Sequence, residues 1–416
     1  MRTNATPTVG SLLAEGRFFR HPDGRAVFLR GVNLSGSVKQ PMEMPSHQPH
    51  NFFEQQQVSF VGRPFPLHEA DQHFARLASW GFNFIRFNVT WEAIEHAGPG
   101  IYDDAYIAYV CKVLLKAGEY GFRAFIDPHQ DVWSRFTGGS GAPSWTLDLA
   151  GFDYRNFAAG DAAIVHNTHD DPENYPKMIW ATNYYKLAAA TMFTLFFAGK
   201  TFAPKLLVDG VSIQDYLQEH YFNSISRLAK AIVQTPGLAN YVVLGYDTLN
   251  EPGSGFIGCT NLSQIMPSQE LRHGLTPAPF QTFLLGEGKE VEGIEVWDLT
   301  SFGPQKISVK SVNPRGKRAW KNNRKCIWEE HGVWSSDTDD LLISDYFTTN
   351  PDTGVKVDFL VDFWKPFINN FTLAIRNVHK NAMIFVEPPV NALPPVFTNK
   401  DAKGPLVFAP HWLLWI

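Results

Sequence analysis

An amide and a carboxylate stand side by side at Asn250 and Glu251, soon after the apolar run at 241–244 and directly before Pro252. An apolar run that ends in proline and glycine is typical of a buried parallel strand that delivers a polar side chain to the open end of a β/α barrel. A glutamate held there can donate and accept a proton during bond cleavage. We therefore predict that Glu251 is a general acid/base and that Asn250 binds substrate beside it.

Other chemically active side chains follow or interrupt earlier apolar runs. Arg86 lies inside the run at 82–89, where a buried arginine needs a charged partner because its desolvation is costly. It either forms an internal salt bridge or orients the catalytic carboxylate. Asp127, His129 and Asp131 follow the run at 122–126 and alternate, so on a strand they would point the same way. A metal cluster is one interpretation, but we favour substrate binding by His129 and Asp131 and predict no metal.

A second carboxylate is needed if the chemistry is glycoside hydrolysis with retention, which uses two carboxyl groups about 5 Å apart. Glu387 ends the apolar run at 382–387 and is the obvious candidate. It lies, however, on the strand immediately after that of Glu251, whereas a retaining barrel places its nucleophile further round the ring. We therefore interpret Glu387 as a cleft-lining or structural residue and keep it as the less favoured nucleophile.

The alternation of strands and helices predicts the scaffold that positions these residues. Apolar strand patterns and amphipathic helix patterns succeed one another in the order expected for right-handed β/α units. Strands are predicted at about 25–35, 82–89, 122–126, 241–246, 382–387 and 406–412, and helices at 69–80, 103–117, 212–234 and 357–380, the last kinked at Pro366. The predicted fold class is α/β, an incomplete (β/α)8 TIM barrel with about six of its eight strands.

One barrel is predicted to occupy residues 1–416. Strands 1–4 fall within 11–254 and include a loop insertion at about 134–209, residues 255–354 form a second insertion, and 355–416 hold strands 5 and 6. The long insertions therefore follow strands 3 and 4, and connections of that length are commonly functional.

The composition of the chain limits its possible partners and its cellular location. A formal net charge of −5 argues against a nucleic-acid partner. Three widely spaced cysteines, Cys111, Cys259 and Cys326, fit neither a disulfide framework nor a zinc site. Residues 1–10 lack the apolar core of a secretory signal, and the apolar stretch at 187–198 is too short to span a bilayer. These features favour a reducing, cytoplasmic location.

The sequence resembles glycoside hydrolase family 5, and within it the endoglycoceramidase-related fungal β-glucosidases that act on glucosylceramide or steryl glucoside. The matching segments are FLRGVNLSGSVK, GFNFIRFNVTWEAIE, FIDPHQDVWSRFTGGSGAPSW, LGYDTLNEP and HGVW. The resemblance implies that Glu251 is the acid/base and Asn250 its sugar-binding neighbour. It also implies substrate contacts for Arg86, His129, Asp131, Lys39, Trp145 as an aromatic platform, and His411 as the histidine of a sixth-strand His-x-Tyr pattern. No cofactor is implied.

The sequence departs from this family after His411. Leu413 stands at the tyrosine position, and the seventh strand with its nucleophile, the eighth strand and a C-terminal β-sandwich are missing. We therefore expect a truncated retaining β-glucosidase of glycolipids that is nearly inactive. The alternatives are a β-glucanase or cellulase-like polysaccharide hydrolase and a non-catalytic carbohydrate- or lipid-binding fragment. A glycolipid or other β-glucoside is the expected partner, and peripheral contact with a membrane stays open.

Overall fold

The fold is built on one parallel sheet. The computed structural model describes residues 11–44, 51–168, 175, 180–322, 324–398, 400–401 and 404–411. Its central sheet has six strands, β4 (Gly31–Leu34), β5 (Phe84–Val89), β6 (Arg123–Pro128), β9 (Val243–Asp247), β15 (Met383–Val386) and β16 (Leu406–Phe408). They are adjacent in chain order and every pairing is parallel. The six-stranded β/α-barrel architecture predicted from the sequence is confirmed.

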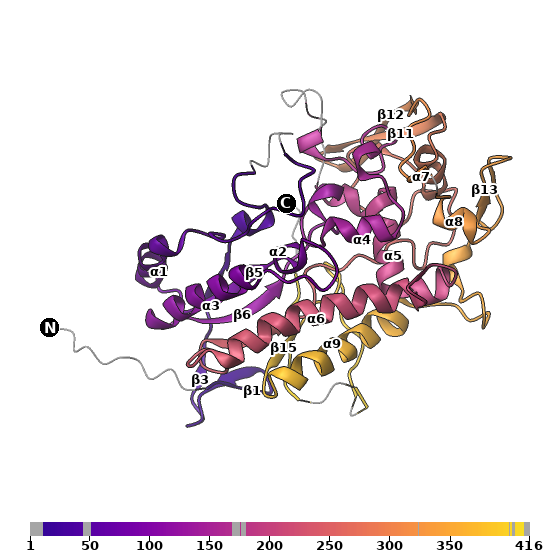
Figure 1. The fold of residues 1–416 in the computed structure, drawn as a ribbon. Helices are drawn as coiled ribbons and strands as arrows, with labels where there is room; N and C mark the ends of the chain where they lie inside the picture. Colours follow the sequence, from indigo (N-terminus) through magenta and orange to yellow (C-terminus); the bar gives the residue numbers. More distant parts are fainter. Residues whose placement is uncertain are drawn as a thin grey trace.

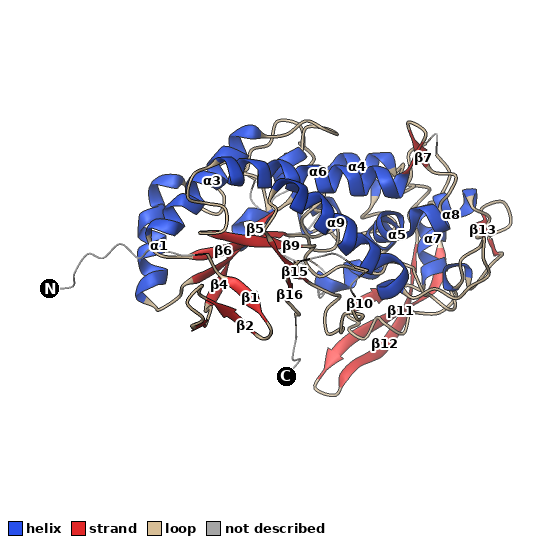
Figure 2. Ribbon diagram, turned by 90° about the horizontal axis from the view of Figure 1, so that it is seen from below, coloured by secondary structure: helices blue, strands red, loops and turns tan. Residues whose placement is uncertain are grey.

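Helices cover one face of this sheet, as both ribbon views show (Figures 1 and 2). The helices between barrel strands are α1 (Ala70–Ser79), α2 (Trp91–Glu95), α3 (Asp104–Glu119), α4 (Ser144–Leu149), α5 (Leu187–Phe202), α6 (Ile213–Gln234) and α9 (Lys365–Val378). Ser212 caps α6 as its sequence predicts, since its hydroxyl accepts the Asp215 N–H at 3.1 Å. The helix predicted at 357–380, with a kink at Pro366, is divided just before that residue: a π-helical segment, Phe359–Trp364, precedes α9, and the proline occupies the first turn of α9.

Side chains alternate between the two faces of the barrel strands. Ile85, Phe87 and Ile126 pack towards the helices, while Phe84 and Phe125 pack with residues of the N-terminal strands on the other face. Those N-terminal strands, β1 (Leu13–Glu15), β2 (Phe18–Arg20) and β3 (Ala26–Val27), form a small antiparallel sheet next to the main sheet (Figure 2). They supply apolar cover to the inner face near the amino ends of the barrel strands.

A close approach of two strands depends on Gly245. A Cβ atom at this position in β9 would lie 1.8 Å from the main-chain oxygen of Met383 in β15. The glycine therefore lets β15 pair closely with β9, the strand that leads to Glu251.

The connection after β9 forms a separate, mostly peripheral unit. It contains β10 (Gly274–Thr276), α7 (Pro279–Gly286), β11 (Val291–Thr300), β12 (Gly303–Val312), α8 (Ile327–Glu330), β13 (Trp334–Ser335) and β14 (Asp340–Leu341). The β11–β12 hairpin projects away from the sheet (Figures 1 and 2). Trp320, Trp328 and Trp334 are buried. Trp320 stacks on Phe152 and Trp328 donates to Thr191, so these two rings attach the unit to the connection after β6, whereas Trp334 packs on α7 within the unit.

The connection after β6 contains more regular structure than its sequence suggested. Besides α4 and α5 it holds the short hairpin β7 (Leu207–Val208) and β8 (Val211–Ser212). Helix α5 includes the apolar stretch at 187–198 and is buried along almost its whole length. Within the described residues, no helix is both long and apolar enough to cross a membrane.

Candidate active site

Glu251 lies four residues beyond β9, and its main chain is held from several sides. Its φ is +40°, a left-handed value that is strained for a residue with a side chain. The N–H of Glu251 donates to Glu387 Oε1 at 2.6 Å. Its carbonyl oxygen accepts hydrogen bonds from Gln130 Nε2 at 3.0 Å and from the Tyr184 hydroxyl at 2.8 Å. Contacts from three other segments therefore over-determine the conformation that places the Glu251 side chain.

Arg86, the arginine inside β5, joins several of the predicted residues. Its Nη2 donates to Asn250 Oδ1 at 2.7 Å and to Glu387 Oε2 at 3.0 Å. Its Nη1 lies 3.2 Å from Asp127 Oδ2, and Nη2 lies 3.8 Å from Asp247 Oδ2. These contacts match the salt-bridge interpretation of Arg86, and they show that the guanidinium also holds the Asn250 amide beside Glu251.

His129 lies between two aspartates at the end of β6. Its Nδ1 is 2.9 Å from Asp127 Oδ2 and its Nε2 is 3.2 Å from Asp131 Oδ2. Lys39 reaches the same Asp131 oxygen at 2.6 Å, and the Ser140 hydroxyl donates to it at 3.0 Å. The sequence prediction that Lys39, His129 and Asp131 share one site is therefore matched by their positions.

Most of these groups face a cavity of about 730 Å³. Its lining includes seven of the predicted site residues, namely Lys39, Arg86, His129, Asp131, Asn250, Glu251 and His411. Gln40 and Arg63 add polar groups, and Met44 and Trp180 add apolar surface. A cavity that combines many hydrogen-bonding side chains with apolar surface suits a polyhydroxylated ligand that carries an apolar substituent.

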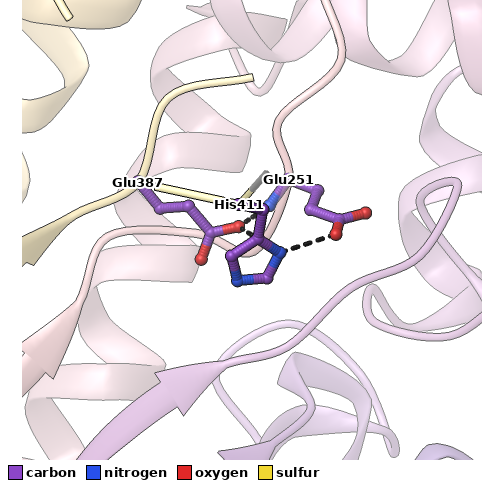
Figure 3. A group of neighbouring side chains, drawn as sticks. All are labelled: Glu251, Glu387 and His411. Carbon is purple, nitrogen blue, oxygen red and sulfur yellow. Dashed lines mark hydrogen bonds and ion pairs between the residues drawn. The ribbon is translucent and has the colours of Figure 1, made fainter. Parts of the chain in front are cut away.

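Glu251, Glu387 and His411 form the innermost cluster. Figure 3 shows the His411 imidazole between the two carboxylates, with Nδ1 2.6 Å from Glu251 Oε1 and 3.4 Å from Glu387 Oε1. The other Glu251 oxygen, Oε2, is buried and has no hydrogen-bond partner. Glu387 is fully buried and does not line the cavity, so of the roles predicted for it the structure favours a structural one.

Burial and crowding shift the proton affinities of this cluster. Burial, and then the Asp247 carboxylate, raise the pKa of Glu387 well above its ordinary value. Burial and the nearby Asp127 raise the pKa of Asp247 to about 6. For Asp127 burial acts in the same direction, yet Arg86 and then His129 lower the pKa of this carboxyl. Three carboxyl groups thus share one guanidinium, and burial disfavours the charged forms of Asp247 and Glu387.

The same groups could also be metal ligands. Glu251, Glu387 and His411 offer three ligand atoms that lie within 4.8 Å of one another. The Arg86 guanidinium, 3.0 Å from Glu387, opposes a second cation there. In the cluster of Asp127, His129 and Asp131, one oxygen of each aspartate is already occupied, on Asp127 by Arg86 and on Asp131 by Lys39.

Trp145, like Glu387, is a predicted site residue that the structure does not bring to the cavity. It is buried, its ring packs edge-on against Trp91 at 5.3 Å, and its Nε1 donates to the carbonyl of Glu95 at 2.9 Å. Trp180, 40% exposed, is instead the tryptophan that lines the cavity. It comes from the same long connection, and its type alone would have made it a candidate. Leu413 lies outside the described residues.

Comparison with known proteins places this geometry in a family. Residues 41–192 match the family model described as cellulase (glycosyl hydrolase family 5). A glucosylceramidase of Aspergillus fumigatus is 45% identical over 424 residues, covering 96% of this chain and 56% of that protein. The family match identifies a glycosyl hydrolase family 5 domain within this chain.

Two further relatives of this chain are steryl glucosidases by name. An ergosteryl-β-glucosidase of Saccharomyces cerevisiae is 42% identical, covering 93% of this chain and 55% of that protein. A crystal structure of Cryptococcus neoformans sterylglucosidase 1 superposes with a TM-score of 0.93 at 40% identity, covering 96% of this chain and 60% of that one. The chain thus spans a little over half the length of the relatives it matches.

Proposed function

We propose that this chain acts on the β-glucosyl bond of glycolipids such as steryl glucoside or glucosylceramide, with retention. The observation that carries the proposal is the Glu251 carboxylate, which faces the 730 Å³ cavity beside Asn250 and His411 and keeps one oxygen without a partner. The names of the relatives support the substrate class, since two are a glucosylceramidase and an ergosteryl-β-glucosidase.

In this proposal Glu251 is the acid/base. It protonates the glycosidic oxygen as the lipid departs, while a nucleophile outside the described residues attacks the anomeric carbon. Glu251 then takes a proton from the water that hydrolyses this glucosyl intermediate. Asn250, fixed by Arg86 at 2.7 Å, is placed to hydrogen-bond a glucose hydroxyl next to the bond that breaks. Lys39, His129 and Asp131 form a charged set that suits further hydroxyl groups.

No described residue is proposed as the nucleophile. Among the described residues that line the cavity, the carboxylates are Glu251 and Asp131. Asp131 is bound by Lys39 at 2.6 Å and by His129 at 3.2 Å, which commits its Oδ2. We therefore expect the 416-residue chain to bind β-glucosides and to hydrolyse them slowly.

The lipid half of the proposed substrate would meet the apolar lining, Met44 and Trp180. Because such lipids reside in membranes, we also propose that the chain contacts a membrane surface while it acts. The three cysteines are free and buried, which fits the proposed cytoplasmic location.

The test separates binding from acid catalysis. Binding of octyl β-glucoside is measured by calorimetry, and glucose release is measured from steryl glucoside and from a dinitrophenyl β-glucoside. We expect Glu251→Gln to bind normally but to lose roughly 10²–10⁴-fold in release from the lipid glucoside. Glucose release from the dinitrophenyl substrate should suffer far less, because that leaving group needs no proton.

The matched control is Glu292→Gln, an exposed glutamate in β11 that should change neither readout. Equal rates for Glu251→Gln and the unaltered chain on steryl glucoside would contradict the acid/base assignment. A clear preference for cello-oligosaccharides over lipid glucosides would instead favour a polysaccharide hydrolase. Binding with no hydrolysis of either glucoside would favour a carbohydrate-binding protein.

A further inference from the structure

Glu387 occupies the position directly behind the proposed acid/base. Its Oε1 accepts the Glu251 N–H at 2.6 Å, and its Oε2 accepts from Arg86 at 3.0 Å. Through Arg86 it is also linked to Asn250, whose Oδ1 accepts from the same Nη2 at 2.7 Å. One buried carboxyl thus contacts the main chain of Glu251 directly and the side chain of Asn250 through one arginine.

The Glu251 main chain needs such a contact. A side-chain-bearing residue at φ +40° is held in a conformation that costs about 1–2 kcal/mol and persists only when its surroundings impose it. Gln130 and Tyr184 hold the carbonyl oxygen of Glu251, but Glu387 is the acceptor for its N–H. If that acceptor is lost, the amide N–H is left buried without a partner, and the peptide is free to turn.

The environment of Glu387 also defines its protonation state. Asp247 Oδ1 accepts the Thr248 N–H at 2.7 Å, whereas Asp247 Oδ2 is buried and has no donor unless the adjacent Glu387 carboxyl carries a proton. The charged groups that face Glu387 are Arg86 from β5, Asp127 from β6, Asp247 from β9, and Glu251 and His411 at the cavity. Arg86 can neutralise only one of the three buried carboxyls around it.

We propose that Glu387 is a positioning residue, a neutral carboxylic acid that shares its proton with Asp247 and holds the Glu251 main chain in the conformation that aims the Glu251 carboxylate into the cavity. This assignment rests on the proposed function of Glu251. It also excludes Glu387 as a nucleophile, because a fully buried, protonated carboxyl cannot attack a sugar in the cavity.

The first measurement does not depend on turnover. Infrared difference spectra are recorded on the 416-residue chain between pH 5 and 8, with Glu387→Gln and Asp247→Asn as variants. The unaltered chain should show the C=O band of a protonated carboxylic acid at neutral pH, and Glu387→Gln should remove it. Absence of this band in the unaltered chain, or its survival in both variants, would overturn the shared proton.

The second measurement reports on Glu251. Glucose release is followed in Glu387→Gln, Glu387→Ala and Tyr184→Phe, the last of which removes another hydrogen bond to Glu251 without touching Glu387. The side-chain amide introduced by Glu387→Gln retains an acceptor for the Glu251 N–H, so this variant should lose less than about tenfold in kcat, and Glu387→Ala about 10²-fold. The KM should change little, and the acidic limb of the pH profile should move in Glu387→Ala.

Two outcomes would overturn the positioning role. If Glu387 were the nucleophile, Glu387→Gln would be as inactive as Glu387→Ala, and azide would restore Glu387→Ala by forming α-glucosyl azide. If Glu387 only stabilised the fold, both variants would unfold more easily but show unchanged kcat and pH profile at a temperature where they stay folded. If no variant, nor the unaltered chain, acts on any glucoside while the infrared band appears as expected, the proposed function fails and the shared proton stands.

Discussion

Two layers of side chains on the same strands differ sharply although they lie only two residues apart. In the lower layer Phe125 stacks on Phe385 with ring centres 4.1 Å apart, and Phe84 lies 5.5 Å from Phe125. One step up each strand, Arg86, Asp127 and Glu387 take the places of those phenylalanines. Every second residue of a strand points inward, so inward side chains two residues apart fall in successive layers. The same strands therefore carry an apolar lower layer and a charged upper layer.

The comparison shows how differently the two layers contribute to the free energy of folding. The lower layer removes aromatic surface from water, which stabilises the fold at any pH. The upper layer places three carboxyls and one guanidinium out of water, where desolvation offsets most of the gain from their attraction. Its value is therefore in geometry: it fixes Asn250 and Glu251 at the floor of the cavity.

The largest expected effect comes from removing the one guanidinium of the upper layer. Arg86→Met should destabilise the chain by about 5 kcal/mol at pH 7, because Asp127 and the Asp247–Glu387 pair lose their charged partner while staying buried. The penalty should shrink as the pH falls, since the carboxyls then take up protons. Urea unfolding at pH 7 and pH 5 measures both effects.

The matched control for Arg86→Met is Arg227→Met. Arg227 also forms a bidentate pair, with Asp104, but on the surface, where 42% of its side chain is exposed. Such a pair contributes about 0–1 kcal/mol. Equal destabilisation by the two variants would show that burial does not distinguish the upper layer.

The next effect tests the lower layer. Phe125→Ala should destabilise the chain by about 3–4 kcal/mol through lost contacts and the cavity it leaves. Glucoside binding should persist, because Phe125 touches neither Asn250 nor Glu251. Phe302→Ala, in which the replaced ring is 90% exposed at the β11–β12 turn, should stay within about 0.5 kcal/mol of the unaltered chain. A loss of glucoside affinity in Phe125→Ala that matches Arg86→Met would show that the two layers are not independent.

Much of this arrangement was predictable from the sequence because strand ends carry local signals. The apolar runs that end at Asp127, Asn250 and Glu387 located strands of the sheet and most of the residues around the cavity, since parallel strands bring their carboxyl ends to one edge. Strand limits were less accurate: the first strand was expected from residue 25, but β4 begins at Gly31, after the separate strand β3.

The errors lie where contacts distant in sequence decide the outcome. Trp145 has the same residue type and the same loop context as Trp180, and only packing against Trp91 and the Glu95 carbonyl separates a buried ring from a cavity ring. The role of Glu387 could not be read from its strand end either. It depends on the N–H of Glu251, which is 136 residues away in the chain and adjacent in space.

The smallest effect concerns two buried histidines that report the difference between charged and apolar surroundings. His129 lies beside the charged upper layer. Burial alone would lower the pKa of His129, but Asp127 and then Asp131 raise this pKa above its ordinary value. His379 sits between β9 and α9, where its Nδ1 accepts from the Tyr246 hydroxyl at 3.1 Å and its Nε2 donates to Asn240 at 3.0 Å. Burial lowers the pKa of His379 to about 4.

The two histidines should give opposite pH dependences. Below pH 6.5 His379 binds a proton in the unfolded chain but stays neutral in the folded chain down to about pH 4. This residue should therefore lower the free energy of unfolding progressively between pH 6.5 and 4, by up to about 3 kcal/mol. The stabilisation from His129 is instead fully present below pH 6.5 and is lost as the pH rises through its higher folded value. Imidazole NMR titrations and urea unfolding from pH 4.5 to 8 measure both, with His379→Gln and His129→Gln assigning each contribution. If His379→Gln leaves the acid limb of the stability curve unchanged, the buried surroundings of His379 accommodate a charge. The contrast between the environments of His379 and His129 would then not hold.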